Sequence, residues 1–198
     1  MRAPAGLSPG LTRGLPAAAR LLRQPGPVAR ERITLGRDAR EGARSNLVRL
    51  APGAPLVEAF VAAMRAATGG EWRPAAFELL SGALEPCIYC LAAPDTGGAR
   101  VVTYTPMRDA GTVRLFGGAA TLGIGADGAP LLHCHAWFAE PHEGRVFGGH
   151  LDTAASRIGG EGVRVLMTVF DGFDIRQLPD AETNHTLFRP LDRSGGGQ

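Results

Sequence analysis

Two short segments set the interpretation of this sequence: Leu131-Leu132-His133-Cys134-His135-Ala136-Trp137-Phe138 and, a few residues later, Arg145-Val146-Phe147-Gly148-Gly149-His150-Leu151. Both have the length and the apolar content of β-strands bounded by turn residues. Pro141–Gly144 lies between them and predicts a turn. We therefore expect the two segments to pair as antiparallel strands, with His133 and His135 on one face and Cys134 on the other.

Short segments of the same kind fill most of the chain from residue 47 onward. They alternate with turn signals such as Gly125-Ala126-Asp127-Gly128, which is typical of hairpins rather than of βαβ units. The further strands expected are Leu47–Leu50, Phe77–Leu80, Cys87–Leu91, Arg100–Thr105, Val113–Phe116, Ala120–Ile124 and Val163–Phe170. Glycines 117, 118, 123 and 125 do not open a helix, so we interpret them as bulges or bends rather than as a phosphate-binding loop.

One segment predicts a helix. Leu56, Phe60 and Met64 recur at four-residue spacing after Pro55, a residue that the first helical position tolerates, and Gly69-Gly70 ends the pattern. The fold class predicted is α+β: a mainly antiparallel β-sheet with one principal helix, in a single domain.

Length and composition set the boundaries of that domain. The 198 residues suit one folded domain and a tail. Residues 1–30 hold five prolines and no acid, so we expect a disordered basic tail there, an α+β domain over residues 31–192, and a flexible C-terminus over 193–198. No apolar run reaches the roughly 18 residues of a membrane span. We expect a cytoplasmic protein without a membrane partner, and three free thiols rather than a disulfide framework.

Charge is distributed unevenly along the chain. Residues 1–45 carry nine Arg and three acids, whereas residues 46–198 carry twelve Arg and sixteen acids. Phosphate binding needs clustered cations, so a nucleic-acid partner would have to be bound by the N-terminal arm. The DNA-contacting candidates are five arginines in the second half of this arm: Arg30, Arg32, Arg37, Arg40 and Arg44.

Four of the five histidines in the chain lie within eighteen residues, three of them in the paired segments and His142 in the turn between. His133 and His135 point to the same site, and His150 on the returning strand would bring a third imidazole to it. Three nitrogen ligands with one open position are typical of a catalytic divalent-metal site, with zinc as the first candidate. The alternative is that these histidines are polar residues on the exposed face of a half-buried strand. His142 is a weaker loop candidate, and His185 has no expected role.

Other reactive groups give weaker signals. Cys87 and Cys90 resemble a redox pair, but they lie in an apolar run without a second cysteine pair, so we expect buried thiols. Cys134 projects away from the neighbouring histidines, which disfavours a nucleophile. Glu140, Glu143 and Glu161 could act as acid or base beside a metal, but acids in turns are usually only solvated.

The His-x-His strand, the Gly144-Arg145-Val146 turn and the Gly148-Gly149-His150-Leu151 element resemble the signature of the PPC domain, found in prokaryotes and, beside AT-hook motifs, in plants. A closing Asp180-Ala181-Glu182-Thr183 is similar to the Asp-x-Glu-Thr of that family. The resemblance implies a homotrimer of α+β domains with a DNA-associated, regulatory role. No Arg-Gly-Arg-Pro hook is present, the nearest sequence being Thr12-Arg13-Gly14-Leu15-Pro16.

The PPC fold is also similar to part of the α-acetolactate decarboxylases, zinc enzymes that hold their metal by a His-x-His pair and a third histidine. That similarity points to the same residues, His133, His135 and His150. It implies an alternative function, a metal-dependent enzyme of decarboxylase or lyase type acting on a small carboxylated substrate. A third hypothesis is that the protein is an interaction module and that its histidines have only a packing role. No catalytic acid, base or arginine is assigned.

Overall fold

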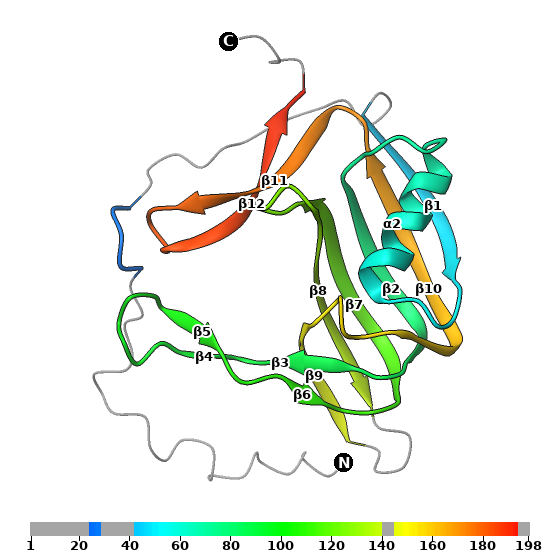
Figure 1. Cartoon of the computed structure of the whole chain (residues 1–198), viewed down its shortest axis with the longest axis horizontal. Helices are drawn as coiled ribbons and strands as arrows, with labels where there is room; N and C mark the ends of the chain where they lie inside the picture. Colours follow the sequence, from blue (N-terminus) through cyan, green and yellow to red (C-terminus); the bar gives the residue numbers. More distant parts are fainter. Residues whose placement is uncertain (1–23, 29–41, 140–144, 194–198) are drawn as a thin grey trace, which may run out of the picture.

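The computed structural model describes residues 24–28, 42–139 and 145–193. Its body is a ten-stranded, mainly antiparallel sheet (Figure 1). The strand order is β1-β10-β2-β7-β8-β9-β3-β6, with β11 joining β7 at one parallel position and β12 pairing with β11. β4 and β5 form a separate two-stranded sheet. The α+β class predicted from the sequence is confirmed.

The described residues form one helix and twelve strands. The helix is α2 (Leu56–Ala67). The strands are β1 (Ala43–Leu50), β2 (Ala75–Leu84), β3 (Ile88–Cys90), β4 (Ala92–Pro94), β5 (Val102–Tyr104), β6 (Arg108–Asp109), β7 (Val113–Ile124), β8 (Pro130–Ala139), β9 (Val146–Leu151), β10 (Ile158–Phe170), β11 (Phe173–Asp180) and β12 (His185–Asp192).

Helix α2 packs its apolar stripe onto the sheet. Leu56, Phe60 and Met64 are fully buried, and the Phe60 ring meets that of Phe77 on β2 edge to face at 4.6 Å. The helix ends as expected, because Gly69 and Gly70 adopt positive φ and the Gly70 amide donates to the Arg65 carbonyl. Figure 1 shows α2 lying along β1, β10 and β2. The residues under it form the core.

Every predicted strand segment overlaps an observed strand, with two differences. Val113–Phe116 and Ala120–Ile124 are one strand, β7, in which the glycines cause a bulge: Leu115 pairs with Phe138 and Gly117 with Trp137, leaving Phe116 between them unpaired. The hairpin of β11 and β12 has no counterpart among the predicted strands, nor do the short strands β4 and β6.

The sheet has two unlike faces. Side chains such as Val48, Val165 and Leu79 point into the core under α2. We call the opposite side the helix-free face. One cross-strand row of directly opposed residues marks it: Leu47, Leu166, Glu78, Ala119, His135 and His150. The predicted histidine site therefore lies on the helix-free face.

Most of the predicted tail (1–30) and C-terminus (193–198) falls outside the described residues, so those boundaries stay predictions. Within the tail, residues 24–28 are described, and the Gly26 amide donates to the Glu182 carbonyl in the β11–β12 turn. No helix in the described ranges is long and apolar enough to cross a membrane.

Candidate metal site

Strand β8 places two of the three histidines by simple alternation. Leu132, Cys134 and Ala136 are buried in the core, whereas His133 and His135 are exposed on the helix-free face. Apolar residues at every second position fix this register, because a slip by one residue would move the histidines into the core. The predicted orientation of His133, Cys134 and His135 is confirmed.

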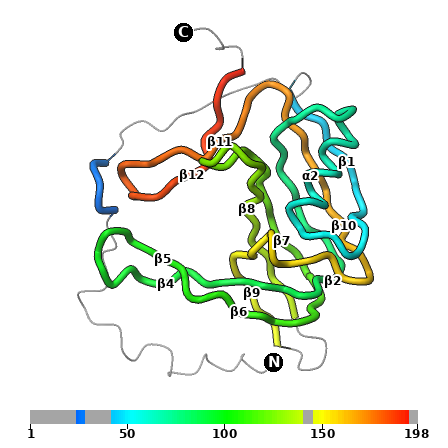
Figure 2. The backbone as a smooth tube through the Cα atoms, in the orientation of Figure 1, coloured from blue at the N-terminus to red at the C-terminus, as the bar shows by residue number. Residues whose placement is uncertain are grey.

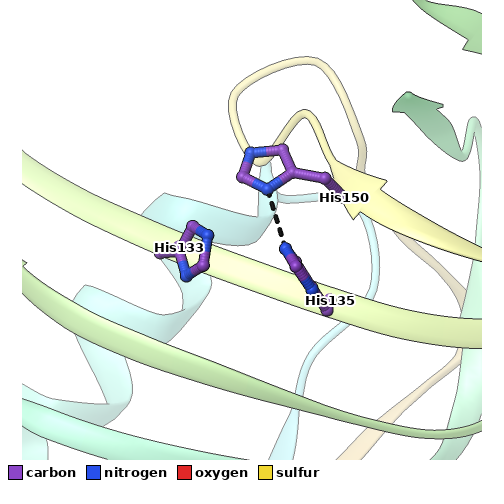
Figure 3. Close-up of side chains that lie close together, drawn as sticks. All are labelled: His133, His135 and His150. Atoms are coloured by element: carbon purple, nitrogen blue, oxygen red, sulfur yellow. Dashed lines mark hydrogen bonds between the residues drawn. The ribbon is translucent and has the colours of Figure 1, made fainter. Parts of the chain in front are cut away.

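Strand β9 brings the third histidine. It runs antiparallel to β8 and sets His150 directly opposite His135. Nε2 of His135 lies 3.0 Å from Nδ1 of His150, and Figure 3 shows His133 beside this pair with its ring turned toward it. One ligand nitrogen from each ring lies within 4.8 Å of the other two. The predicted turn, residues 141–144, lies outside the described residues, but the pairing it implied is present.

The surroundings of His133 and His150 favour their neutral form. Burial, together with the neighbouring His150 and His135, lowers the pKa of His133 to about 4. Burial and His135 also lower the pKa of His150, against a raising effect of Asp152. A neutral imidazole has a free nitrogen lone pair, which is the form that binds a metal. The environment therefore favours the metal-binding form of His133 and His150 at neutral pH.

The three imidazole donors suit a divalent cation of intermediate softness. Three imidazoles suit Zn²⁺ and similar metals, and a structural zinc site would be closed by a fourth protein ligand. Among the described residues, no other Cys, His, Asp or Glu joins this cluster. Cys134 is buried on the opposite face of β8. His133, His135 and His150 would hold the ion, and its remaining coordination would stay open toward solvent and an adjoining pocket.

That pocket lies between two hairpins and has a volume of about 630 Å³. Val102 and Tyr104 of β5 line one side, and residues of β11 and β12 line the other. Figure 2 shows the β4–β5 and β11–β12 hairpins leaving the sheet on the same side. His133 and His150 line its inner end. The Tyr104 ring lies 5.1 Å from that of His150, and Phe188 meets His133 edge to face at 6.5 Å. The volume lies in the range of small-molecule sites.

Contacts between the hairpin tips hold the pocket walls together. The Arg100 guanidinium donates to the Asn184 carbonyl, and the Asn184 side-chain amide donates to the Ala99 carbonyl. Nε2 of His185 lies 3.1 Å from the Val102 carbonyl oxygen. Asn184 has φ of 56°, a left-handed conformation that asparagine tolerates better than most residues. The β11–β12 turn is thus shaped to reach the β4–β5 hairpin.

Asp180 stabilises the same β11–β12 turn through its side chain. Its buried carboxylate accepts hydrogen bonds from the amide and the hydroxyl of Thr183 and from the Arg189 guanidinium. This explains in physical terms why aspartate and threonine stand three positions apart in the Asp180-Ala181-Glu182-Thr183 segment. A carboxylate at the end of one strand caps the turn and pairs with a cation on the next.

Of the five predicted DNA-contacting arginines, Arg44 lies within the described residues. Arg44 lies on β1, where its guanidinium pairs with the Asp171 carboxylate. Arg30, Arg32, Arg37 and Arg40 lie outside the described residues, as do His142, Glu140 and Glu143. Glu161 lies away from the histidines, beside Arg114.

The sequence predictions did not include most of the pocket lining, for example Tyr104, Gln177 and Phe188. His185, for which no role was expected, also lines the pocket. These residues come from hairpins that meet only in three dimensions, so sequence spacing carried no signal for them.

No protein-family model and no curated protein matches the chain. Solved structures do. A metal-containing protein of Archaeoglobus fulgidus is 19% identical, with a TM-score of 0.57 over 75% of this chain and 95% of the other. The plant- and prokaryote-conserved (PPC) protein of Pyrococcus horikoshii is 20% identical, with a TM-score of 0.55 over 77% and 95%. A candidate DNA-binding protein of Ralstonia eutropha JMP134 is 14% identical, with a TM-score of 0.55 over 76% and 97%. At such identities the likeness concerns the fold, and the chain has the fold of the PPC protein, as its histidine and Gly-Gly-His-Leu elements predicted.

Proposed function

We propose that the protein is a cytoplasmic, homotrimeric PPC-type protein that holds a divalent metal ion, with zinc as the first candidate, and has a DNA-associated, regulatory role. The observation that carries the metal part is the convergence of His133, His135 and His150 within 4.8 Å. It is supported by the surroundings of His133 and His150, which lower the pKa of both side chains and so favour their neutral, metal-binding form. The metal-containing character of the A. fulgidus protein of the same fold points in the same direction.

Metal affinity tests this part directly. Metal-free protein would be titrated with Zn²⁺ in competition with a chromophoric chelator. One tight site per chain is expected, and His135→Ala should weaken it by at least about tenfold, because loss of one of three protein ligands removes a large share of the binding free energy. Equal affinity in the wild type and the variant would rule out the histidine site.

The DNA part rests on the basic arm. Candidate DNA-binding proteins of R. eutropha and Bacteroides thetaiotaomicron have the same fold. In this chain, Arg30, Arg32, Arg37, Arg40 and Arg44 would contact phosphates, and a trimer would bring three arms together. Arg44 would have to exchange its pairing with Asp171 for a phosphate. Electrostatic contacts of this kind predict weak, sequence-tolerant binding that falls steeply with salt.

Retention on duplex DNA at graded salt concentrations tests that part. The variant would carry glutamine at Arg30, Arg32, Arg37 and Arg40, and every residue of β1 would stay as it is. We expect wild-type retention at low salt and a clear loss in the variant. Absence of wild-type retention at every salt concentration would exclude the DNA role and leave the metal site standing.

The pocket supports a second candidate function, a metal-dependent enzyme of decarboxylase or lyase type acting on a small carboxylated substrate. A divalent ion bound at one end of a cavity acts as a Lewis acid on a molecule bound in it. Residues of both hairpins would orient that molecule. Turnover of small carboxylic acids by the zinc-loaded protein, lost in His135→Ala, would favour this function over a purely regulatory one.

A further inference from the structure

A second cavity lies on the helix-free face, apart from the histidine cluster. It has a volume of about 620 Å³ and shares no lining residue with the pocket between the hairpins. Residues of β1, β10, β2 and β7, four successive strands of the sheet, line it. Three of these residues are arginines: Arg49, Arg114 and Arg164. We call this cavity the arginine pocket.

The arginine pocket concentrates positive charge in an otherwise acidic part of the chain. Residues 46–198 carry more acids than arginines, yet three guanidinium groups gather here. Arg49 and Arg164 stand directly opposite each other on β1 and β10, a like-charge pair that is unfavourable across strands. Within the part of the chain that the structure describes, the Arg164 side chain has no hydrogen-bond or ion-pair partner. An anion from outside would relieve the repulsion.

Glu161, the one acid among the described residues that line the pocket, leaves most of this charge uncompensated. Its carboxylate lies 3.5 Å from the Arg114 guanidinium, and the two side chains are 63% and 64% exposed. An ion pair of this kind contributes little in water. The Arg49 guanidinium donates to the backbone carbonyl of Glu161 at 2.9 Å, not to its carboxylate. Two positive charges therefore remain uncompensated in the pocket.

The backbone of β10 helps to fix Arg49 in place. Between Ile158 and Val163 this strand shifts its register against β2, as at a β-bulge. Gly162 in this stretch has φ of 72°, and an added Cβ would crowd Arg49 Nε at 3.3 Å. Glycine therefore lets the Arg49 side chain lie against the bulge and reach the Glu161 carbonyl. A guanidinium that is fixed in advance loses less conformational entropy when a ligand binds.

An exposed aromatic ring also lines the arginine pocket. Phe116 lies at the β7 bulge, between the paired residues Leu115 and Gly117, and exposes 52% of its surface. Leu80 on β2 adds a second exposed apolar side chain. Aromatic side chains of this kind bind the flat face of a nucleic-acid base by stacking, whichever base it is. The pocket thus combines an anion-binding part with an aromatic part.

We propose that the arginine pocket binds a nucleoside monophosphate, whose phosphate is held by the three arginines and whose base stacks on Phe116. A phosphate monoester carries a charge of about −1.5 to −2 at pH 7, which matches the two uncompensated positive charges. Guanidinium groups bind phosphate oxygens through pairs of parallel hydrogen bonds. The Ser81 hydroxyl, on β2 opposite Arg164, adds a neutral donor to the same pocket. The volume of the cavity suits a small molecule of this class.

Calorimetric titration of the metal-free chain with adenosine 5′-monophosphate tests the proposal. Removal of metal keeps the phosphate from binding to an ion at the histidines. We expect one site per chain for the nucleotide, at least about tenfold weaker binding of inorganic phosphate at the same site, and no measurable binding of adenosine, because the phosphate carries the charge that the arginines recognise.

Two variants separate the two parts of the pocket. Arg164→Gln should weaken nucleotide binding by at least about tenfold, since it removes a charge-assisted contact. Because Arg164 has no side-chain partner to lose, the variant should fold normally, which circular dichroism checks. Phe116→Ala should weaken nucleotide binding by at least about fivefold and leave the affinity for inorganic phosphate unchanged. Arg108→Gln is the matched control, because Arg108 is exposed on β6 and outside the pocket, and it should bind as the wild type does.

Three results would overturn the proposal. One is the absence of nucleotide binding by the wild type at millimolar concentration, and another is equal affinity in the wild type and Arg164→Gln. The third is equal affinity for nucleotide and inorganic phosphate together with no effect of Phe116→Ala, which would leave a site for free anions only. None of these results affects the zinc titration or the retention on DNA, because the histidines and the N-terminal arm lie outside this pocket.

Discussion

His135 and His150 stand directly opposite each other on β8 and β9, and Nε2 of the first lies 3.0 Å from Nδ1 of the second. The two rings share one hydrogen bond at this distance, and a bound metal ion would replace it by two coordinate bonds. Because the two rings are held by a sheet, little rearrangement is needed to turn the pair, with His133, into a metal-binding group.

Metal binding should therefore stabilise the folded chain. A ligand that binds only the native state adds RT ln(1 + [L]/Kd), about 4 kcal/mol at a thousandfold excess over Kd. Thermal unfolding of metal-free wild type with added Zn²⁺ should show a clear rise in Tm. His150→Ala should unfold at the same temperature with or without Zn²⁺. A rise that persists in this variant would place the metal elsewhere.

The free energy of unfolding should depend on Phe60 more than on an exposed position of helix α2. Phe60 is fully buried and packs against Phe77, so Phe60→Ala should cost about 3–5 kcal/mol of the free energy of unfolding. Glu58→Ala, on the exposed side of the same helix, should stay within about 0.5 kcal/mol of the wild type. Chemical denaturation followed by circular dichroism measures both. Equal effects would contradict the packing of α2 on the sheet.

The three thiols should be unreactive in the folded protein. All are buried, and burial together with Asp109 and Cys134 raises the pKa of Cys87 to about 12. The nucleophilic thiolate is then scarce at neutral pH. A disulfide-forming chromogenic reagent should label none of the thiols quickly in native protein and all of them in guanidinium chloride. Fast labelling of native protein would show that the core around Cys87 opens.

Asp180 should control the pocket through the β11–β12 turn. Asp180→Ala removes the acceptor of three hydrogen bonds and leaves Arg189 and Thr183 without their partner, at a cost of about 1–3 kcal/mol. Amide hydrogen exchange should accelerate in β11 and β12 and stay unchanged in β8. Asp174→Ala is a suitable comparison, since its ion pair with Arg176 lies away from the turn. Exchange that accelerates equally throughout the sheet would contradict a local role.

Much of this architecture can be read from the sequence, and the histidine strands show why. Alternation on β8 fixes which side chains face the core, so His133 and His135 had to share a face, and an antiparallel return strand had to bring His150 near. The α2 pattern is equally local. By contrast, β11 and β12 carry Pro179, Pro190 and several charges, and their pairing depends on the Asp180 turn and on contacts with residues 99–102. Such long-range contacts leave no periodic pattern, so the pocket and His185 emerge only from the structure.

The metal content of untagged protein tests the central claim most directly. Elemental analysis would compare the wild type, His133→Ala, His135→Ala, His150→Ala and the control His185→Ala, each purified without chelator and then dialysed against Zn²⁺. The site predicts close to one divalent ion per chain in the wild type and in His185→Ala, and a strong loss in each of the other three. A wild type without metal after dialysis, or metal retained in all three variants, would contradict it.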